Sequence, residues 1–129
     1  MSTIVIPTLR FSERAVLDRC IEAFGLEIVD LYVGETEDQV EHAELRLGDA
    51  WIMCGTIREE GLSMATGGAS LYFIVDTPDE VDAMHERALS AGIASAREPK
   101  DEEYGGRGCT LQDADGNYWS FGTYRPSGL

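Results

Sequence analysis

The pattern of apolar and polar positions along this chain predicts a strand, a helix and further strands. Residues 3–10 are apolar and β-branched, which is typical of a strand. A helix follows, with Ser12 as its N-cap and Gly25 as its C-terminal cap. Its inward face carries apolar residues at helical spacing, namely Val16, Leu17, Cys20, Ile21 and Phe24. Residues 27–33, 41–47 and 51–54 then read as strands.

The second half of the chain predicts the same series of elements. Residues 70–76 form a strand, and Thr77, Pro78 and Glu80 make a strong helix start. We expect Val81, Met84 and Ala88 to face inward and Gly92 to end this helix. The remaining elements are a short strand at 93–96, a long charged loop at 97–108, and a closing hairpin of 109–113 with 117–123.

These two series indicate an internal duplication. Gly25 and Gly92 are separated by the same number of positions as Met53 and Ser120, since 92 − 25 equals 120 − 53. We therefore expect one α+β domain over 1–129, with module one at 3–57, a linker at 58–68 and module two at 69–124. Two half-sheets set together enclose a pocket, so binding of a small molecule is the leading functional hypothesis.

Charge and composition exclude several classes of function. A net charge of −14 argues against binding to nucleic acids or anionic membranes, because both need clustered basic residues. The acidic residues either keep the protein dissolved or attract a cationic ligand. No apolar run reaches the roughly 20 residues that span a bilayer. With no secretion signal at the N-terminus and Cys20, Cys54 and Cys109 in apolar surroundings, we expect buried thiols in a reducing cytoplasm.

Four segments together resemble one known family. They are FGLE at 24–27, HAELRLGD at 42–49, YGGRG at 104–108 and DADGNYWSFGTY at 113–124. This set is similar to the vicinal oxygen chelate superfamily, which includes glyoxalase I, extradiol dioxygenases, and fosfomycin and bleomycin resistance proteins. The resemblance implies two βαβββ modules that form a cupped mixed sheet around a cavity, usually in a homodimer.

The resemblance also implies where a metal would bind. Enzymes of the superfamily hold a divalent metal on the first and last strands of each module. The matching positions here are Val5, Met53, Ser70 and Ser120. None offers a carboxylate or an imidazole, and neutral hydroxyl and thioether groups are weak ligands for such cations. We therefore predict no metal and no other cofactor at this site.

Metal binding elsewhere has little support in the sequence. The chain has two histidines, His42 and His85, at no metal-binding spacing, and we expect His85 on the surface of the second helix. Asp113 to Asn117 partly resembles a calcium loop but lacks its terminal glutamate, so we read these residues as a hairpin turn.

Strand alternation predicts which side chains line the cavity. Ala43, Leu45 and Leu47 should face a helix, and Trp119 should pack in the core. The opposite face should be aromatic and hydrogen-bonding. We expect its ligand-binding residues to be His42, Glu44, Trp51, Met53, Ser70, Tyr72, Tyr118 and Ser120.

Three functions remain open from the sequence. A metal-free protein similar to the bleomycin resistance branch would bind an antibiotic or metabolite, cationic or aromatic, without changing it. An enzyme of the same superfamily, a lyase, isomerase or dioxygenase, would use a displaced metal site or acid–base chemistry by His42 and Glu44. A scaffold with a collapsed cavity would bind nothing.

Overall fold

The computed structural model describes residues 1–58 and 65–129 as two compact units, Met1–Gly67 and Gly68–Leu129. Unit 1 contains β1 (Thr8–Phe11), α1 (Arg14–Phe24), β2 (Glu27–Val33), β3 (Val40–Leu47) and β4 (Ala50–Thr56). Unit 2 contains β5 (Ser70–Ile74), α2 (Pro78–Ser90), β6 (Ala94–Asp101), β7 (Arg107–Gln112) and β8 (Tyr118–Gly122). Most of the predicted linker, residues 59–64, lies outside the described residues.

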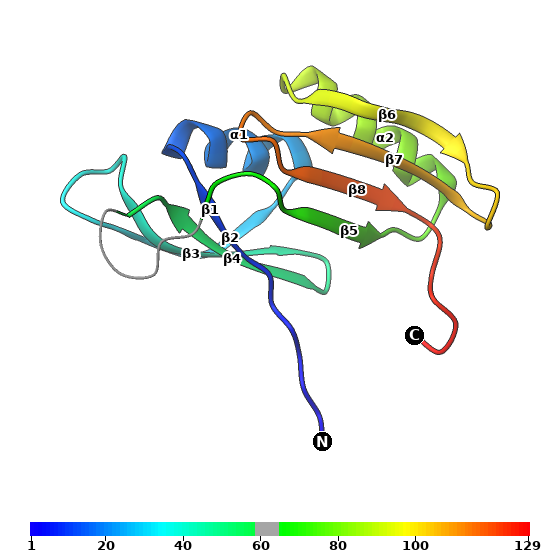
Figure 1. Cartoon of the computed structure of the whole chain (residues 1–129), viewed down its shortest axis with the longest axis horizontal. Coiled ribbons are helices and arrows are strands. Elements are labelled where there is room, and N and C mark those ends of the chain that lie inside the picture. Colours follow the sequence, from blue (N-terminus) through cyan, green and yellow to red (C-terminus); the bar gives the residue numbers. More distant parts are fainter. Residues whose placement is uncertain (59–64) are drawn as a thin grey trace. The chain divides into compact units, whose positions relative to one another are not determined.

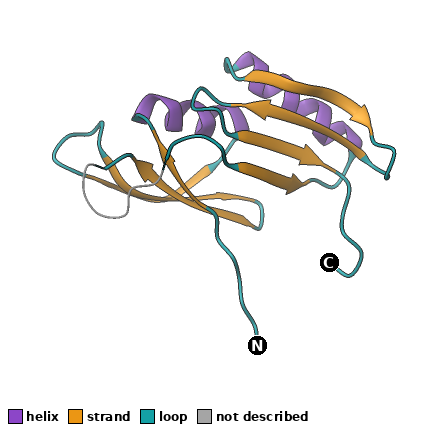
Figure 2. Cartoon of the chain, in the orientation of Figure 1, coloured by secondary structure: helices purple, strands orange, loops and turns teal. Residues whose placement is uncertain are grey.

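Each unit has the βαβββ order, and each forms its own four-stranded mixed sheet (Figures 1 and 2). The strand orders are β1-β4-β3-β2 and β5-β8-β7-β6, so the two topologies are equivalent. The first strand of each unit pairs in parallel with the last, and the other pairs are antiparallel. The α+β class with two repeated modules is therefore confirmed.

The cores follow the predicted alternation. In unit 1, Ala43, Leu45, Ile52 and Cys54 are buried on one face of the sheet, and Leu47 is half-buried at a strand end. In unit 2, Trp119 is fully buried as predicted and stacks on Phe73, with ring centres 5.9 Å apart. All three cysteines, Cys20, Cys54 and Cys109, are buried, as predicted.

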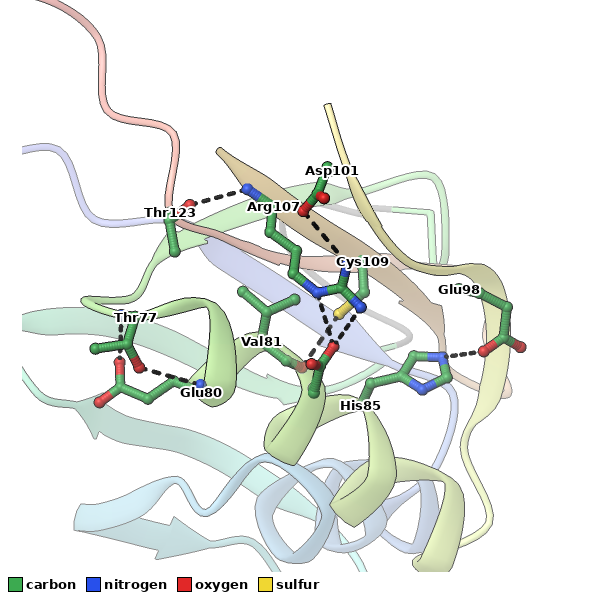
Figure 3. Close-up of polar contacts among 10 residues, drawn as sticks. Thr77, Glu80, Val81, His85, Glu98, Asp101, Arg107, Cys109 and Thr123 are labelled. Carbon is green, nitrogen blue, oxygen red and sulfur yellow. Dashed lines mark hydrogen bonds and ion pairs between the residues drawn. The ribbon is translucent and has the colours of Figure 1, made fainter. Parts of the chain in front are cut away.

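The helix starts differ between the two units. The predicted capping box of α2 is present: the Thr77 side chain accepts from the Glu80 amide, and the Glu80 carboxylate accepts from the Thr77 amide (Figure 3). The predicted Ser12 cap of α1 is wrong, because Glu13 occupies the N-cap position and makes no side-chain cap bond. Gly25 ends α1 in the left-handed conformation, with φ of 66°.

The prediction that His85 lies on the helix surface is also wrong. His85 is 4% exposed, and its Nε2 lies 2.7 Å from the Ser95 hydroxyl. The same nitrogen lies 3.6 Å from the Glu98 carboxylate (Figure 3). It takes an inward position between Val81 and Ala88, both fully buried, while Met84 is half-buried. A polar imidazole is tolerated there because the hydroxyl of β6 satisfies it.

Two strand boundaries differ from the prediction. β1 begins at Thr8, not at residue 3, because Pro7 has no amide hydrogen to donate to the sheet; only its carbonyl accepts from Met53. β6 runs to Asp101 through residues predicted to be a charged loop. It is an edge strand, where Pro99 and charged side chains can face water.

Candidate functional site

The open face of the unit 1 sheet carries the first half of the predicted site. His42, Glu44, Trp51 and Met53 alternate with the buried residues of β3 and β4 and are all half-buried. Strand register places Glu44 opposite Met53 and Arg46 opposite Trp51. The structure therefore brings these four predicted residues onto one continuous patch of sheet.

Polar contacts hold this patch in place. His42 Nε2 lies 3.0 Å from Glu44 Oε2, and Arg46 is bound by Glu27 through Nε at 3.1 Å and a terminal nitrogen at 2.7 Å. The Arg46 guanidinium also lies 5.7 Å from the centre of a Trp51 ring. Glu44 thus pairs with His42, and Arg46 pairs across to β2 and holds the indole by a cation–π contact.

Three further residues of unit 1 extend the patch. Tyr32 lies opposite His42, with ring centres 6.2 Å apart, and its hydroxyl donates to Asp30 at 3.2 Å. The Asp30 carboxylate raises the pKa of the Tyr32 phenol, which keeps that hydroxyl a donor. Arg10 of β1 lies over Gly55, where a Cβ would clash with the Arg10 guanidinium. Sequence reasoning missed all three, because it predicted the strand at 27–33 without assigning its faces and took Val5 as the site position of the first strand.

The open face of the unit 2 sheet carries the second half. Ser70 pairs with Tyr118 and Tyr72 pairs with Ser120 across the parallel strands β5 and β8. Ser120 shares a 2.8 Å hydrogen bond with Thr110 of β7. This face therefore carries hydroxyl and phenol groups.

Residues near the end of this sheet were missed by the sequence reasoning. The Glu102 side chain is 8% exposed and accepts from Arg97 at 2.8 Å. The Tyr72 hydroxyl donates to the Tyr124 carbonyl at 2.6 Å, and Tyr104 contacts Tyr124 edge to face. Burial raises the pKa of Tyr72, with further contributions from Tyr104 and Tyr124, so its phenol stays protonated.

A separate groove lies between α1 and β2 in unit 1. It has a volume of about 500 Å³ and is lined by Arg14, Ala15, Asp18, Leu31, Val33, Glu37 and Asp38. None of the predicted site residues lines it. Its only cation, Arg14, is already held by Asp18 and by the Glu37 carbonyl. We therefore assign candidate ligand contacts to the open face of each sheet, taken unit by unit, because each face carries aromatic and hydrogen-bonding groups.

Comparison with known proteins identifies the family. Residues 21–121 match the model described as "Glyoxalase/Bleomycin resistance protein/Dioxygenase superfamily". The chain belongs to this superfamily. A search of the curated proteins finds no match.

Solved structures show the same fold. TioX from Micromonospora sp. ML1 is 22% identical with a TM-score of 0.73, over 96% of this chain and 100% of that one. The fosfomycin resistance protein FosX from Mesorhizobium loti is 20% identical with a TM-score of 0.67, over 97% and 94%. Lactoylglutathione lyase from Agrobacterium tumefaciens is 20% identical with a TM-score of 0.69, over 95% and 93%.

The metal implied by the family resemblance does not fit the residues present. Val5 precedes β1 and is 87% exposed, and the register places Thr8, not Val5, opposite Met53. In unit 2, Tyr72 is the residue opposite Ser120. Whichever set is taken, the donors are hydroxyl, phenol or thioether groups, without a carboxylate or an imidazole. Within residues 1–58 and 65–129, no three His, Cys, Asp or Glu side chains are grouped to hold a metal ion.

Proposed function

We propose that this protein is a metal-independent member of the superfamily that binds a flat, aromatic and preferably cationic compound, such as an antibiotic or a metabolite. The observation that carries the proposal is the chemistry of the two open sheet faces. The unit 1 face presents Trp51 beside His42 and Glu44, and the unit 2 face presents Tyr72 and Tyr118 beside Ser120. Met53, Ser70 and Ser120, three of the positions that the resemblance assigns to a metal, carry thioether and hydroxyl groups in place of carboxylates and imidazoles.

Each part of the surface has a role in this proposal. The Trp51 ring, held by Arg46, stacks on the ligand. His42, Glu44, Ser70 and Ser120 fix its orientation by hydrogen bonds, and Met53 supplies a polarisable apolar contact. The net charge of −14 raises the local concentration of a cation. We also propose that the protein is cytoplasmic and forms a homodimer.

A second candidate function rests on the contact between His42 and Glu44. A carboxylate 3.0 Å from an imidazole nitrogen can orient a general base, so a lyase or isomerase reaction centred on His42 is the alternative. Both side chains are more than a third exposed, at 39% and 35%, which favours ligand contact over acid–base chemistry. Chemical turnover of a bound compound, lost in His42→Gln, would support the alternative.

The test is a thermal-shift screen of cationic antibiotics and aromatic metabolites, followed by calorimetric titration of the strongest hit. Trp51→Ala should weaken binding several-fold, since an aromatic contact contributes about 1 kcal/mol beyond buried area. Glu44→Gln should weaken a cationic hit at low salt and have less effect at high salt. Glu35→Gln, the same change on an exposed loop, is the control. Unchanged affinity in both site variants would refute the proposed surface.

A further inference from the structure

Three tyrosines from three separate segments gather at one end of the unit 2 sheet. Tyr72 lies on β5, Tyr104 in the turn between β6 and β7, and Tyr124 just after β8. The Tyr72 hydroxyl donates to the Tyr124 carbonyl at 2.6 Å, and the Tyr104 and Tyr124 rings meet edge to face with centres 5.0 Å apart. We call Tyr72, Tyr104 and Tyr124 the tyrosine cluster.

Glycines make this close gathering possible. A Cβ at Gly122 would lie 2.6 Å from the Tyr72 hydroxyl, so only glycine lets the Tyr72 ring lie across β8. A Cβ at Gly106 would lie 2.9 Å from the Tyr124 amide nitrogen, and Gly106 has φ of 78°. The absence of a side chain at Gly122 and at Gly106 therefore makes room for the Tyr72 ring and for the Tyr124 backbone.

The segment carrying Tyr124 is also fixed by hydrogen bonds. The Arg107 amide donates to the Thr123 hydroxyl at 2.9 Å (Figure 3), and the Thr123 amide donates to the Arg107 carbonyl at 3.0 Å. Arg107 is itself held by Asp82 and Asp101. The rings are thus presented by backbone that is anchored to β7, which lowers the entropy lost on binding.

The cluster stays open to solvent although it is well anchored. Tyr72 is 47% exposed, Tyr104 64% and Tyr124 40%. Grouped exposed aromatic surface on a rigid support is typical of a binding site. The neighbouring Glu102 carboxylate is paired with Arg97 at 2.8 Å, so its charge is compensated. Ring stacking, and not attraction of a cation by itself, is the interaction this place offers.

We propose that the tyrosine cluster is a binding site for a planar aromatic ring system, with Tyr104 and Tyr124 as contact residues additional to the predicted ones. This inference rests on the proposed function, because the cluster continues the open face of unit 2 through Tyr72. It names the chemical class of the ligand portion bound there: a flat, fused aromatic ring, recognised by its faces and edges.

The probe for the test is 9-aminoacridine, a planar fluorescent amine, titrated in 0.3 M NaCl to screen the general charge of the protein. Tyr104→Leu and Tyr124→Leu keep an apolar side chain and remove the ring, and each should raise the dissociation constant about two- to tenfold. Tyr104→Phe retains the ring and should stay close to wild type. Leu89→Ala changes an exposed side chain of α2 and is the control. Tetraethylammonium, a cation without a ring, should not displace the probe.

The outcomes separate this inference from the proposed function. Weaker probe binding in both leucine variants supports the cluster. Unchanged binding in both, with a loss in Trp51→Ala, overturns the cluster and leaves the proposed function standing. Displacement by tetraethylammonium, or no binding of the probe to wild type at millimolar concentration, also overturns the inference. Unchanged binding in all three variants contradicts both proposals.

Discussion

At the scale of single residues, one buried carboxylate organises the hairpin turn before β8. Asp113 is 5% exposed and accepts from the amides of Asp115 and Asn117, both at 3.0 Å. Its other oxygen accepts from the Asn117 side chain and from the Trp119 indole, both at 2.9 Å. The residues that resemble a calcium loop therefore form a hairpin turn, as predicted, and the Asp113 carboxylate accepts hydrogen bonds from the turn and from Trp119.

Asp113→Asn should lower the free energy of unfolding by about 2 to 4 kcal/mol, because an amide cannot accept all four hydrogen bonds and buried donors stay unpaired. Urea denaturation measures this change. Asp49→Asn, the same substitution at an exposed turn position, should have little effect. Equal destabilisation by the two variants would contradict the role assigned to Asp113.

The raised pKa values of two buried thiols predict that the protein becomes less stable at alkaline pH. Burial raises the pKa of Cys54 to about 12 and that of Cys109 to about 11, from an ordinary value of 9.0. Because the pKa of each thiol is higher in the folded than in the unfolded protein, each thiol makes its full contribution to the free energy of unfolding below pH 9. That contribution is lost as the pH rises through the folded pKa, at about 1.4 kcal/mol per pH unit.

Urea unfolding between pH 8 and 10.5 should therefore show falling stability, with a shallower fall in Cys54→Ala. In the folded protein, both thiols should resist a disulfide exchange reagent at pH 8 and react after unfolding. Rapid reaction of two or more thiols in the folded protein would argue against their burial.

Residue roles were predictable where alternation decided them and not where tertiary contacts did. The core position of Trp119 followed from its antiphase with Ser120. His85 is polar and sits between Met84 and Glu86 in the sequence, so nothing there revealed that Ser95, ten positions later, satisfies it. Tyr72 lies across Gly122, and the Tyr124 backbone lies against Gly106, because neither glycine has a Cβ, and such close approaches have no periodic signal.

At the scale of elements, the two helix starts differ in a testable way. Thr77→Ala should destabilise the protein by about 1 kcal/mol, because it removes the side-chain cap of α2, whereas Thr77→Ser keeps the cap. Glu13→Ser should stabilise the protein by up to about 1 kcal/mol, because Glu13 has an extended N-cap conformation but no cap bond. Thermal melts of the three variants test both. A Glu13→Ser variant less stable than wild type would contradict the assignment.

Most elements were predictable because their periodicity or their end signals are strong. The helices, the glycine that ends α1 and the closing hairpin all followed from local sequence. The extent of β6 did not, because its residues, Ala94–Asp101, read as a charged loop and become a strand only by pairing with β7. A position at the sheet edge is a property of topology, and the local pattern does not show it.

The edge strands β2 and β6, at equivalent positions in the two sheets, also differ in what they expose. β6 carries Pro99 and Lys100, which discourage pairing with another strand. β2 carries Ile28, Val29 and Val33, exposed by 47%, 43% and 44%. This contrast supports β2 as the edge used in the proposed homodimer.

At the scale of the whole molecule, sedimentation at micromolar concentration should give twice the mass of the 14.2 kDa chain. Val33→Lys should shift the protein toward monomer, since a charge on the edge of β2 opposes strand pairing. Leu89→Lys, at an exposed position of α2, should leave the mass unchanged. A wild-type protein that sediments only as a 14.2 kDa species would refute the dimer.

The chain thus has the fold of the superfamily, but the side chains at the expected metal-binding positions are poor ligands for a divalent metal. In the described part of the structure, no helix has the length and apolar character to cross a membrane. The duplicated fold was predictable because both halves carry the same pattern. The compound that binds was not, since the fold fixes the positions of side chains and leaves their chemistry to each member.

The most direct test of the central claim is the metal content of purified, untagged protein from cells supplied with zinc, nickel, manganese and iron. The double variant Thr8→His with Met53→Glu, which places an imidazole opposite a carboxylate, provides a comparison and should retain more metal than wild type. We expect elemental analysis of the wild type to give far less than one equivalent of each metal. Close to one equivalent of any of them, lost together with ligand binding on chelation, would contradict the account.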